Sequence, residues 1–310
     1  MNIRLQIRRV PTAALLIASL VTVAARTVDA QANSKAPRNM LVTTAWLAEH
    51  AKDPNLVVFQ VGPKVMYDSG HVAGARPVTL NELSLPPVEG GLALQMASIE
   101  QLTAWANANG ISDKSHVVVV AQDENLQSAT RVIFTLAYLG ALDRASLLDG
   151  GFKAWRAEGR AVSTEMPAAP AASKFTAKPR PEIIATLAQV EAVTKDSGRT
   201  ALVDARLPRF YNGDGGGYPR PGHIPTAVNI PLNTMSANAF MKPASELKTL
   251  FSQAGVNGDK PIITYCHIGQ QATVLWFVAT MLGYDAKMFD GSFQEWSGTT
   301  LPLVAPAGKP

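Results

Sequence analysis

The sequence predicts an α/β fold made of two related domains, each a parallel sheet with helices on both faces. Short apolar runs rich in valine and isoleucine alternate with longer apolar segments of helical length, which is the pattern of parallel strands buried on both faces. The same order of segments recurs 143 residues later, measured from Gly140 to Gly283. A repeat of that length indicates a duplicated domain rather than a solenoid.

The first copy contains two predicted buried strands and one buried helix. Residues 56–61 (LVVFQV) and 116–121 (HVVVVA) predict the strands, and residues 126–139 predict an apolar helix that ends at Gly140. The motif LLDGGFKAW follows at residues 147–155. Parallel strands need a long crossover, and the helix supplies it.

The second copy repeats these elements in the same order. Residues 200–204 (TALVD) and 261–265 (PIITY) predict strands, and residues 271–282 predict an almost wholly apolar helix that ends at Gly283. The motif MFDGSFQEW follows at residues 288–296.

Short motifs can also be overlaid between the copies. We expect the two tryptophans of these motifs to be core residues under a repeated turn. The matched motifs are Gly70-His71-Val72 with Gly222-His223-Ile224, and Asp149-Gly150 plus Trp155 with Asp290-Gly291 plus Trp296.

This organisation predicts that the chain is divided into four segments. Residues 1–30 are a predicted signal peptide, residues 38–160 a first domain, residues 161–180 a linker and residues 181–302 a second domain. The linker is predicted from its Ala, Pro, Ser and Lys content without periodicity.

The N-terminus has the features of an export signal. A basic region with Arg4, Arg8 and Arg9 precedes the apolar residues 10–25, and Val28-Asp29-Ala30 offers a cleavage site before Gln31. The apolar run is short for a membrane anchor. We therefore expect a periplasmic or secreted protein without a stable membrane anchor, and the choice between the Sec and twin-arginine routes stays open.

Composition narrows the class of protein. Of the 310 residues 47% are hydrophobic and 17% are charged, which suits packed cores. The net charge of +4 is scattered and forms no dense basic run, so we expect no nucleic-acid partner. No His, Cys, Asp and Glu cluster has metal-ligand spacing, and no metal or cofactor is expected. A monomer is expected, although the sequence leaves the oligomeric state open.

Cys266 is the single cysteine, and it lies between a predicted strand and a predicted helix. A lone thiol in an exported protein makes no internal disulfide and needs another reason to be there. The loop CHIGQQA, residues 266–272, would direct backbone N–H groups into a concavity at a helix N-terminus. Such surroundings favour a thiolate and an adjacent anion, and Gly269 permits a tight turn.

The second copy contains four further motifs: VDAR (203–206), PGHIPTAVNIPL (221–232), YCHIGQQA (265–272) and FDGSFQEW (289–296). The first copy contains GHVAGA (residues 70–75) and LLDGGFKAW. In order and spacing, the four motifs resemble the catalytic domain of tandem-domain sulfurtransferases of the rhodanese family that use thiosulfate or 3-mercaptopyruvate. The two motifs of the first copy resemble the inactive domain of the same proteins.

The resemblance implies a two-step transfer of sulfur. The Cys266 thiolate would take the outer sulfur of a small anionic donor as a persulfide, and a thiol or cyanide would then remove it. Arg206 matches an arginine that binds the donor. The backbone that would cradle the persulfide belongs to His267, Ile268, Gly269, Gln270, Gln271 and Ala272.

The donor stays open between thiosulfate and 3-mercaptopyruvate. Thiosulfate-type loops usually carry basic residues after the cysteine, and mercaptopyruvate-type loops carry small and hydroxyl residues. His267, Gln270 and Gln271 fit neither pattern.

Two other functions compete with the transferase. A cysteine-dependent phosphatase would need an arginine six positions after the nucleophile, where this chain has Ala272. A non-catalytic sulfur carrier or binding module is the second alternative, because the first domain has Asp123 where the offset of 143 places the cysteine. We expect the first domain to form one wall of an interdomain cleft.

The remaining candidate residues have structural interpretations. His71 and His223 are expected to bond to backbone rather than act as bases. Arg209 and Arg220 either extend an anion site or are surface charges. His267 either tunes the charge of the neighbouring cysteine or faces solvent. The glycine-rich residues 213–222 lack the lysine of a phosphate loop and predict a mobile loop near the cleft.

Overall fold

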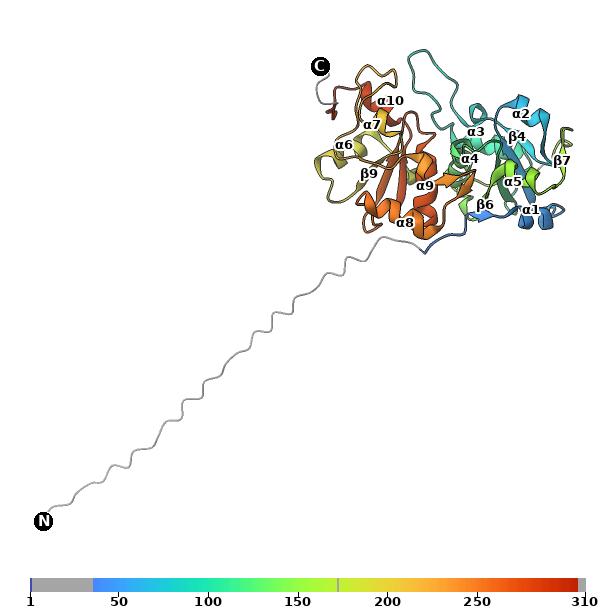
Figure 1. Cartoon of the computed structure of the whole chain (residues 1–310), viewed down its shortest axis with the longest axis horizontal. Coiled ribbons are helices and arrows are strands. Elements are labelled where there is room, and N and C mark those ends of the chain that lie inside the picture. The colour runs from blue at the N-terminus through green and yellow to red at the C-terminus, as the bar shows by residue number, and fades with distance from the viewer. Residues whose placement is uncertain (2–35, 172, 306–310) are drawn as a thin grey trace. The chain divides into compact units, whose positions relative to one another are not determined.

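The computed structural model describes residue 1, residues 36–171 and residues 173–305 (Figure 1). Apart from its first residue, the predicted signal peptide at residues 1–30 lies outside the described residues. Within the described part, no helix combines the length and apolar character that a membrane span requires.

Two five-stranded parallel sheets confirm the predicted fold class. The first has the order β1-β6-β5-β2-β4 and the second the order β10-β9-β13-β14-β8, and every neighbouring pair in both is parallel. The strands of the first sheet are β1 (Leu41–Val42), β2 (Leu56–Val61), β4 (Arg76–Val78), β5 (His116–Ala121) and β6 (Ala145–Leu148). Those of the second are β8 (Ile184–Ala185), β9 (Ala201–Asp204), β10 (Val228–Asn229), β13 (Ile262–Tyr265) and β14 (Ala286–Phe289).

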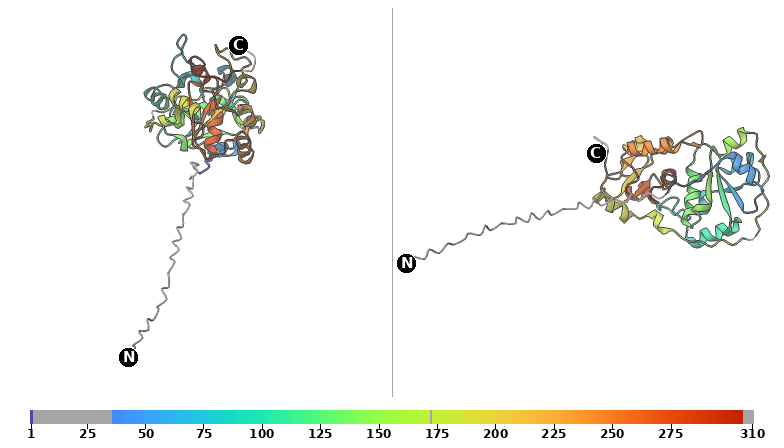
Figure 2. Two further views of the ribbon diagram at one scale, coloured as in Figure 1. Left: turned by 90° about the vertical axis from the view of Figure 1, so that its left-hand side faces the viewer. Right: turned by 90° about the horizontal axis from the view of Figure 1, so that it is seen from below.

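Helices join and cover these strands, and they repeat between the halves (Figures 1 and 2). The first half has α1 (Thr44–His50), α2 (Lys64–Ser69), α3 (Ile99–Ala108), α4 (Gln127–Tyr138) and α5 (Gly151–Ala157). The second has α6 (Leu187–Lys195), α7 (Pro208–Tyr211), α8 (Ala244–Gln253), α9 (Ala272–Met281) and α10 (Ser292–Ser297). Short 3₁₀ turns lie at Leu80–Leu83, Leu142–Arg144, Pro181–Ile183 and Leu232–Thr234.

Two small antiparallel ribbons complete the fold. One pairs β3 (His71–Val72) with β7 (Val162–Ser163), so the start of the predicted linker is bound to the first domain. The other pairs β11 (Ser236–Ala237) with β12 (Phe240–Met241).

The side chains of β5 point alternately to the two faces of the sheet, which explains why helices cover both faces. Val117 and Val119 belong to the apolar cluster that contains α3 and α4, whereas Val118 and Val120 belong to the cluster that contains side chains of α1 and α5. Successive side chains of a strand point to opposite faces. A run of valines therefore serves both faces at once.

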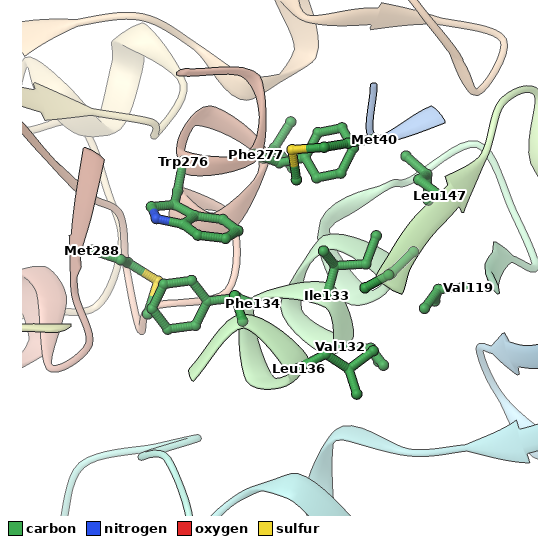
Figure 3. Close-up of a cluster of buried hydrophobic side chains, with 14 of the residues drawn as sticks. Met40, Val119, Val132, Ile133, Phe134, Leu136, Leu147, Trp276, Phe277 and Met288 are labelled. Atoms are coloured by element: carbon green, nitrogen blue, oxygen red, sulfur yellow. The ribbon is translucent and has the colours of Figure 1, made fainter. Parts of the chain in front are cut away.

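The two domains meet through α4 and α9, whose side chains share one continuous core. Phe134 packs edge-on against Trp276 with ring centroids 4.8 Å apart, and Met288 lies beside them (Figure 3). The hydroxyls of Thr130 and Thr273, which the 143-residue offset makes equivalent, share a hydrogen bond of 2.7 Å. Equivalent residues that touch each other lie on the local twofold axis of the two copies.

Candidate active site

Cys266 lies at the carboxyl end of β13, where parallel sheets place their ligands. Its side chain is fully buried. Its backbone N–H donates to Ser292 Oγ at 3.1 Å, and its carbonyl accepts from the Phe293 N–H at 3.0 Å. Ser292 Oγ also lies 4.0 Å from the sulfur. The start of α10 thus fixes the cysteine from one side.

Ser292 itself has an unusual backbone. Its φ is +51°, a left-handed conformation that residues other than glycine and asparagine rarely adopt. Its hydroxyl donates to the carbonyl of Phe289 at 2.8 Å while it accepts from Cys266. Strain of this kind concentrates at functional sites, where the surrounding structure maintains it. In the sequence, the one signal for Ser292 is the change from DGG in the first motif to DGS in the second.

The loop after Cys266 presents unpaired backbone donors. Among the described residues, no backbone N–H from residue 267 to residue 272 donates a hydrogen bond to the protein. Five of these groups precede α9 and the sixth belongs to its first residue, where the helix N-terminus adds positive partial charge. Successive N–H groups of this kind form an anion-binding concavity. The loop predicted to cradle the persulfide therefore has the donors that such a role requires.

Gly269 lets this loop pack directly on the neighbouring turn. Its φ is +77°, and a Cβ at this position would lie 2.5 Å from the carbonyl oxygen of Asp290. Any larger residue would push the loop away from Asp290.

His267 is half-buried between aromatic rings instead of facing solvent. Its ring lies edge-on to Phe210 at 4.7 Å, and its Nδ1 is 3.0 Å from the hydroxyl of Tyr218. Burial, with the positive charge of Arg206, lowers the pKa of His267 to about 4, so the imidazole is neutral at pH 7. Burial, with the charge of nearby Cys266, raises the pKa of Tyr218 to about 12.

Tyr218 belongs to the glycine-rich residues 213–222, so this segment reaches the cysteine loop. Its length distinguishes the two domains. His71 follows Tyr67 by four positions in the first domain, and His223 follows Tyr211 by twelve positions in the second. The second domain therefore carries eight additional residues at this place, and Tyr218 is one of them.

Arg206 is buried with its guanidinium on Asp204. Nε and Nη2 donate to the two carboxylate oxygens at 3.0 and 2.6 Å, and Nη2 also donates to the Gly222 carbonyl at 2.9 Å. The guanidinium lies 3.9 Å from the ring centre of Phe293. Burial lowers the pKa of Arg206, but hydrogen bonds and charge from Asp204 outweigh burial and raise it. Pairing with a nearby carboxylate is the alternative to donor binding for Arg206, and the structure supplies that carboxylate in Asp204.

The first domain also contacts the cysteine loop. Arg131 of α4 donates from Nη1 to the Gly269 carbonyl at 3.1 Å and to Asp290 Oδ1 at 2.6 Å. Gln270 Nε2 donates to Ser128 Oγ at 2.9 Å. Sequence reasoning missed Arg131, although a charged residue inside an apolar helix signals a buried pair.

A pocket of about 470 Å³ lies beside this loop, between the domains. Gln271 and Val274 form part of its wall from the second domain, together with Leu207 and Leu232. Residues 124–127 line it from the first domain. This arrangement places a wall of the first domain where the sequence led us to expect one.

The other candidate residues have structural roles. His71 and His223 each stack on a tyrosine and bond through Nδ1 to its carbonyl, at 3.0 and 2.9 Å. Arg220 donates to the carbonyls of Thr299 and Leu301. The cation of Arg209 lies on the ring of Phe210.

The predicted core tryptophans are confirmed. Trp155 and Trp296 are buried, and each donates its indole N–H to a carbonyl six residues later.

Comparison with known proteins identifies the family. The model of the rhodanese-like domain matches the chain twice, at residues 43–158 and 186–299. The chain belongs to the rhodanese family. The duplicated sheets, the shared core and the cysteine loop described above are therefore two rhodanese domains and the loop of the second.

Three proteins are similar to this rhodanese over most of its length. The sulfur carrier protein TtuD of Thermus thermophilus is 33% identical over 272 residues, which cover 83% of this chain and 93% of that protein. A Synechococcus elongatus protein with the provisional name thiosulfate sulfurtransferase is 30% identical over 302 residues, with 93% and 92% covered. The crystal structure of SseA from Escherichia coli, described as a 3-mercaptopyruvate sulfotransferase, superposes with a TM-score of 0.73 at 26% identity, covering 83% of this chain and 99% of SseA.

Proposed function

We propose that this rhodanese is a sulfurtransferase that moves a sulfane sulfur from a small anionic donor through a persulfide on Cys266. The observation that supports this most strongly is the row of six backbone N–H groups beside the buried cysteine that have no partner in the described part of the chain. They supply fixed donors for the charge that would develop on the outer sulfur. The sulfurtransferase names of similar proteins support the same reaction class.

The proposed first step is attack by the Cys266 thiolate on the outer sulfur of the donor. With thiosulfate, a new S–S bond forms, the old S–S bond breaks and sulfite leaves with the electron pair. With 3-mercaptopyruvate, which has a single sulfur, a new S–S bond forms between that sulfur and Cys266 as the C–S bond breaks. The electron pair leaves on the pyruvate enolate, which takes up a proton from water to give pyruvate. The persulfide anion would then lie against the N–H groups of residues 267–272.

The proposed second step returns the enzyme to its starting state. A thiolate or cyanide attacks the outer sulfur of the persulfide, and the Cys266 thiolate leaves. Because His267 is neutral at pH 7, it adds no charge to this exchange. The donor would enter through the interdomain pocket that Gln271 lines, with Arg206 as a nearby positive charge.

A sulfur carrier is the second candidate function, because TtuD bears that name and is 33% identical. A carrier would load one sulfur and stop, whereas a transferase turns over. We also propose, from the N-terminal leader alone, that the protein acts in the periplasm or outside the cell.

Two kinetic measurements test the proposal. We expect sulfite release from thiosulfate or pyruvate release from 3-mercaptopyruvate to continue for many cycles when cyanide or a thiol is present. Comparing kcat/KM for the two donors side by side identifies the preferred one. Release that stops after one equivalent per Cys266 would establish the carrier, and release of neither product would contradict both functions.

A further inference from the structure

We propose that Arg131, a residue of the first domain, is a positioning residue for the catalytic loop of the second domain. Arg131 acts through the Gly269 peptide. Because the two residues belong to different domains, the loop adopts its catalytic conformation only when the domains are docked. This inference rests on the proposed sulfur transfer.

The contacts of Arg131 show a buried cation held by three oxygen acceptors and, more weakly, by the sulfur of Met288. Its side chain is 1% exposed. Nη1 reaches the Gly269 carbonyl at 3.1 Å and Asp290 Oδ1 at 2.6 Å, while Nη2 donates to the Leu94 carbonyl at 2.6 Å. The second oxygen of Asp290 accepts from the Met96 N–H at 2.8 Å. Both charges of the pair are thus hydrogen-bonded as well as paired.

The contact of Arg131 with the Gly269 carbonyl also orients one backbone N–H group of the cysteine loop. In a trans peptide the C=O of one residue and the N–H of the next lie in one plane and point in opposite directions. A carbonyl of Gly269 that faces Arg131 therefore turns the N–H of Gln270 away from Arg131. That N–H is one of the six groups without a protein partner. Arg131 thus fixes the direction of a donor that it does not touch.

The twofold relation between the domains shows that domain docking alone does not require this arginine. Asp149, the equivalent of Asp290, also accepts from a backbone N–H of the opposite domain, that of Met241 at 2.8 Å. Both aspartates therefore hold the interface in the same way. The position equivalent to Arg131, however, is Val274, which lies on α9 and carries no charge. The cation occurs only on the side of the interface that faces the cysteine loop.

Energetics favour a positioning role over a contribution to stability. Removing two charges from water offsets most of the attraction between them, so a buried pair adds little net stability over apolar residues of similar size. Its value is geometric, because it fixes a peptide plane. Small displacements of groups that stabilise a transition state cost about 100-fold in rate.

The test compares four full-length variants with the natural protein. Arg131→Met removes the cation, and Arg131→Met with Asp290→Asn removes both charges while the amide oxygen keeps an acceptor for Met96. Arg131→Lys restores the charge, and Asp149→Asn is the matched control at the equivalent interface contact. The measurements are kcat and KM for the donor, the pH profile of Cys266 alkylation by iodoacetamide, and Tm.

We expect both Met variants to lower kcat about 10- to 100-fold with little change in KM, and to shift alkylation of Cys266 to higher pH. Arg131→Lys should recover part of both effects. Asp149→Asn keeps an amide oxygen as acceptor for the Met241 N–H and should leave Tm, kcat and the alkylation profile little changed.

Two outcomes would overturn the proposal. One is a folded double variant with unchanged kcat and alkylation profile. The other is an equal kcat loss in Asp149→Asn, which would reduce Arg131 to a docking contact. If the natural protein turned over neither donor, the proposed function would fail. The alkylation profile would still decide the role of Arg131, since it needs no donor.

Discussion

The loops that follow β13 and β5 occupy the same place in two copies of one fold, but their backbone donors have different partners. After β13, no N–H from residue 267 to residue 272 has a partner among the described residues. After β5, the Asp123 carboxylate accepts from the Asn125 N–H at 2.9 Å, and the Asn125 side chain accepts from the Gln127 N–H at 3.4 Å. The first loop pairs two of its donors, the N–H groups of Asn125 and Gln127, with its own side chains. The second leaves them for a ligand.

The turns that begin α5 and α10 also differ between the two domains. Gly151 begins α5 with φ of +55°, and its counterpart Ser292 begins α10 with φ of +51°. The first domain uses the residue that adopts this conformation without strain, and the second keeps a hydroxyl there at a cost of about 1 kcal/mol. That hydroxyl touches Cys266. At this turn, only the domain that has the nucleophile carries the strain of a left-handed non-glycine residue.

Cys266→Ser should have the largest effect, because it removes the main chemical difference between the loops. Oxygen cannot form the persulfide, so turnover should fall at least about 1,000-fold. The two side chains are nearly isosteric, and Tm should change little. Substantial sulfur transfer by the folded variant would show that the nucleophile lies elsewhere.

Arg206→Ala should have the next largest effect. Two consequences are expected, because the guanidinium is both a buried partner of Asp204 and the predicted contact for the donor. Loss of a donor contact costs about 30- to 1,000-fold in the donor half-reaction, and much less in transfer from preloaded persulfide to a neutral thiol.

A control separates the two consequences of losing Arg206. An uncompensated buried carboxylate would lower the free energy of unfolding by about 3–5 kcal/mol. The double change Arg206→Ala with Asp204→Ala removes that carboxylate. If the double variant regains both stability and the donor half-reaction, Arg206 only holds the end of β9.

Ser292→Gly should have an intermediate effect, since it gives the second domain the residue found in the first. The glycine relieves left-handed strain but removes the acceptor for the Cys266 N–H and the hydroxyl near the sulfur. We expect the free energy of unfolding to stay within about 1 kcal/mol and kcat to fall about 10-fold.

The matched control for Ser292→Gly is the reverse change, Gly151→Ser. A Cβ there would lie 2.8 Å from the Ala121 carbonyl, so Tm should fall while kcat stays unchanged. Equal loss of kcat in both variants would mean that the hydroxyl has no specific role.

The sequence predicted more of the fold than of the site's surroundings. Strands at residues 56–61 and 116–121 and the helix before Gly140 are confirmed, because each depends on local apolar patterning. Cys266 could be singled out because it is the only thiol and lies between a strand and a helix. The contacts of Arg131 could not be predicted, because they depend on how the two domains dock. Tyr218 could not be placed either, since a glycine-rich insertion has no periodicity to indicate its path.

Asp123→Ala should have the smallest effect, and it tests whether the first loop takes part in chemistry. Asp123 is exposed, and its carboxylate accepts only from the Asn125 N–H among the described residues. Its loss frees one solvent-accessible donor in a loop that has no nucleophile. We expect kcat within about twofold of the natural protein and a stability loss of about 1 kcal/mol or less. The measurements are donor turnover and the urea midpoint. Residues 124–127 line the interdomain pocket, so a change in KM alone would mean that this loop contacts the substrate. A kcat loss as large as that of Cys266→Ser would break the comparison, because a loop without a nucleophile would then be part of the catalytic machinery.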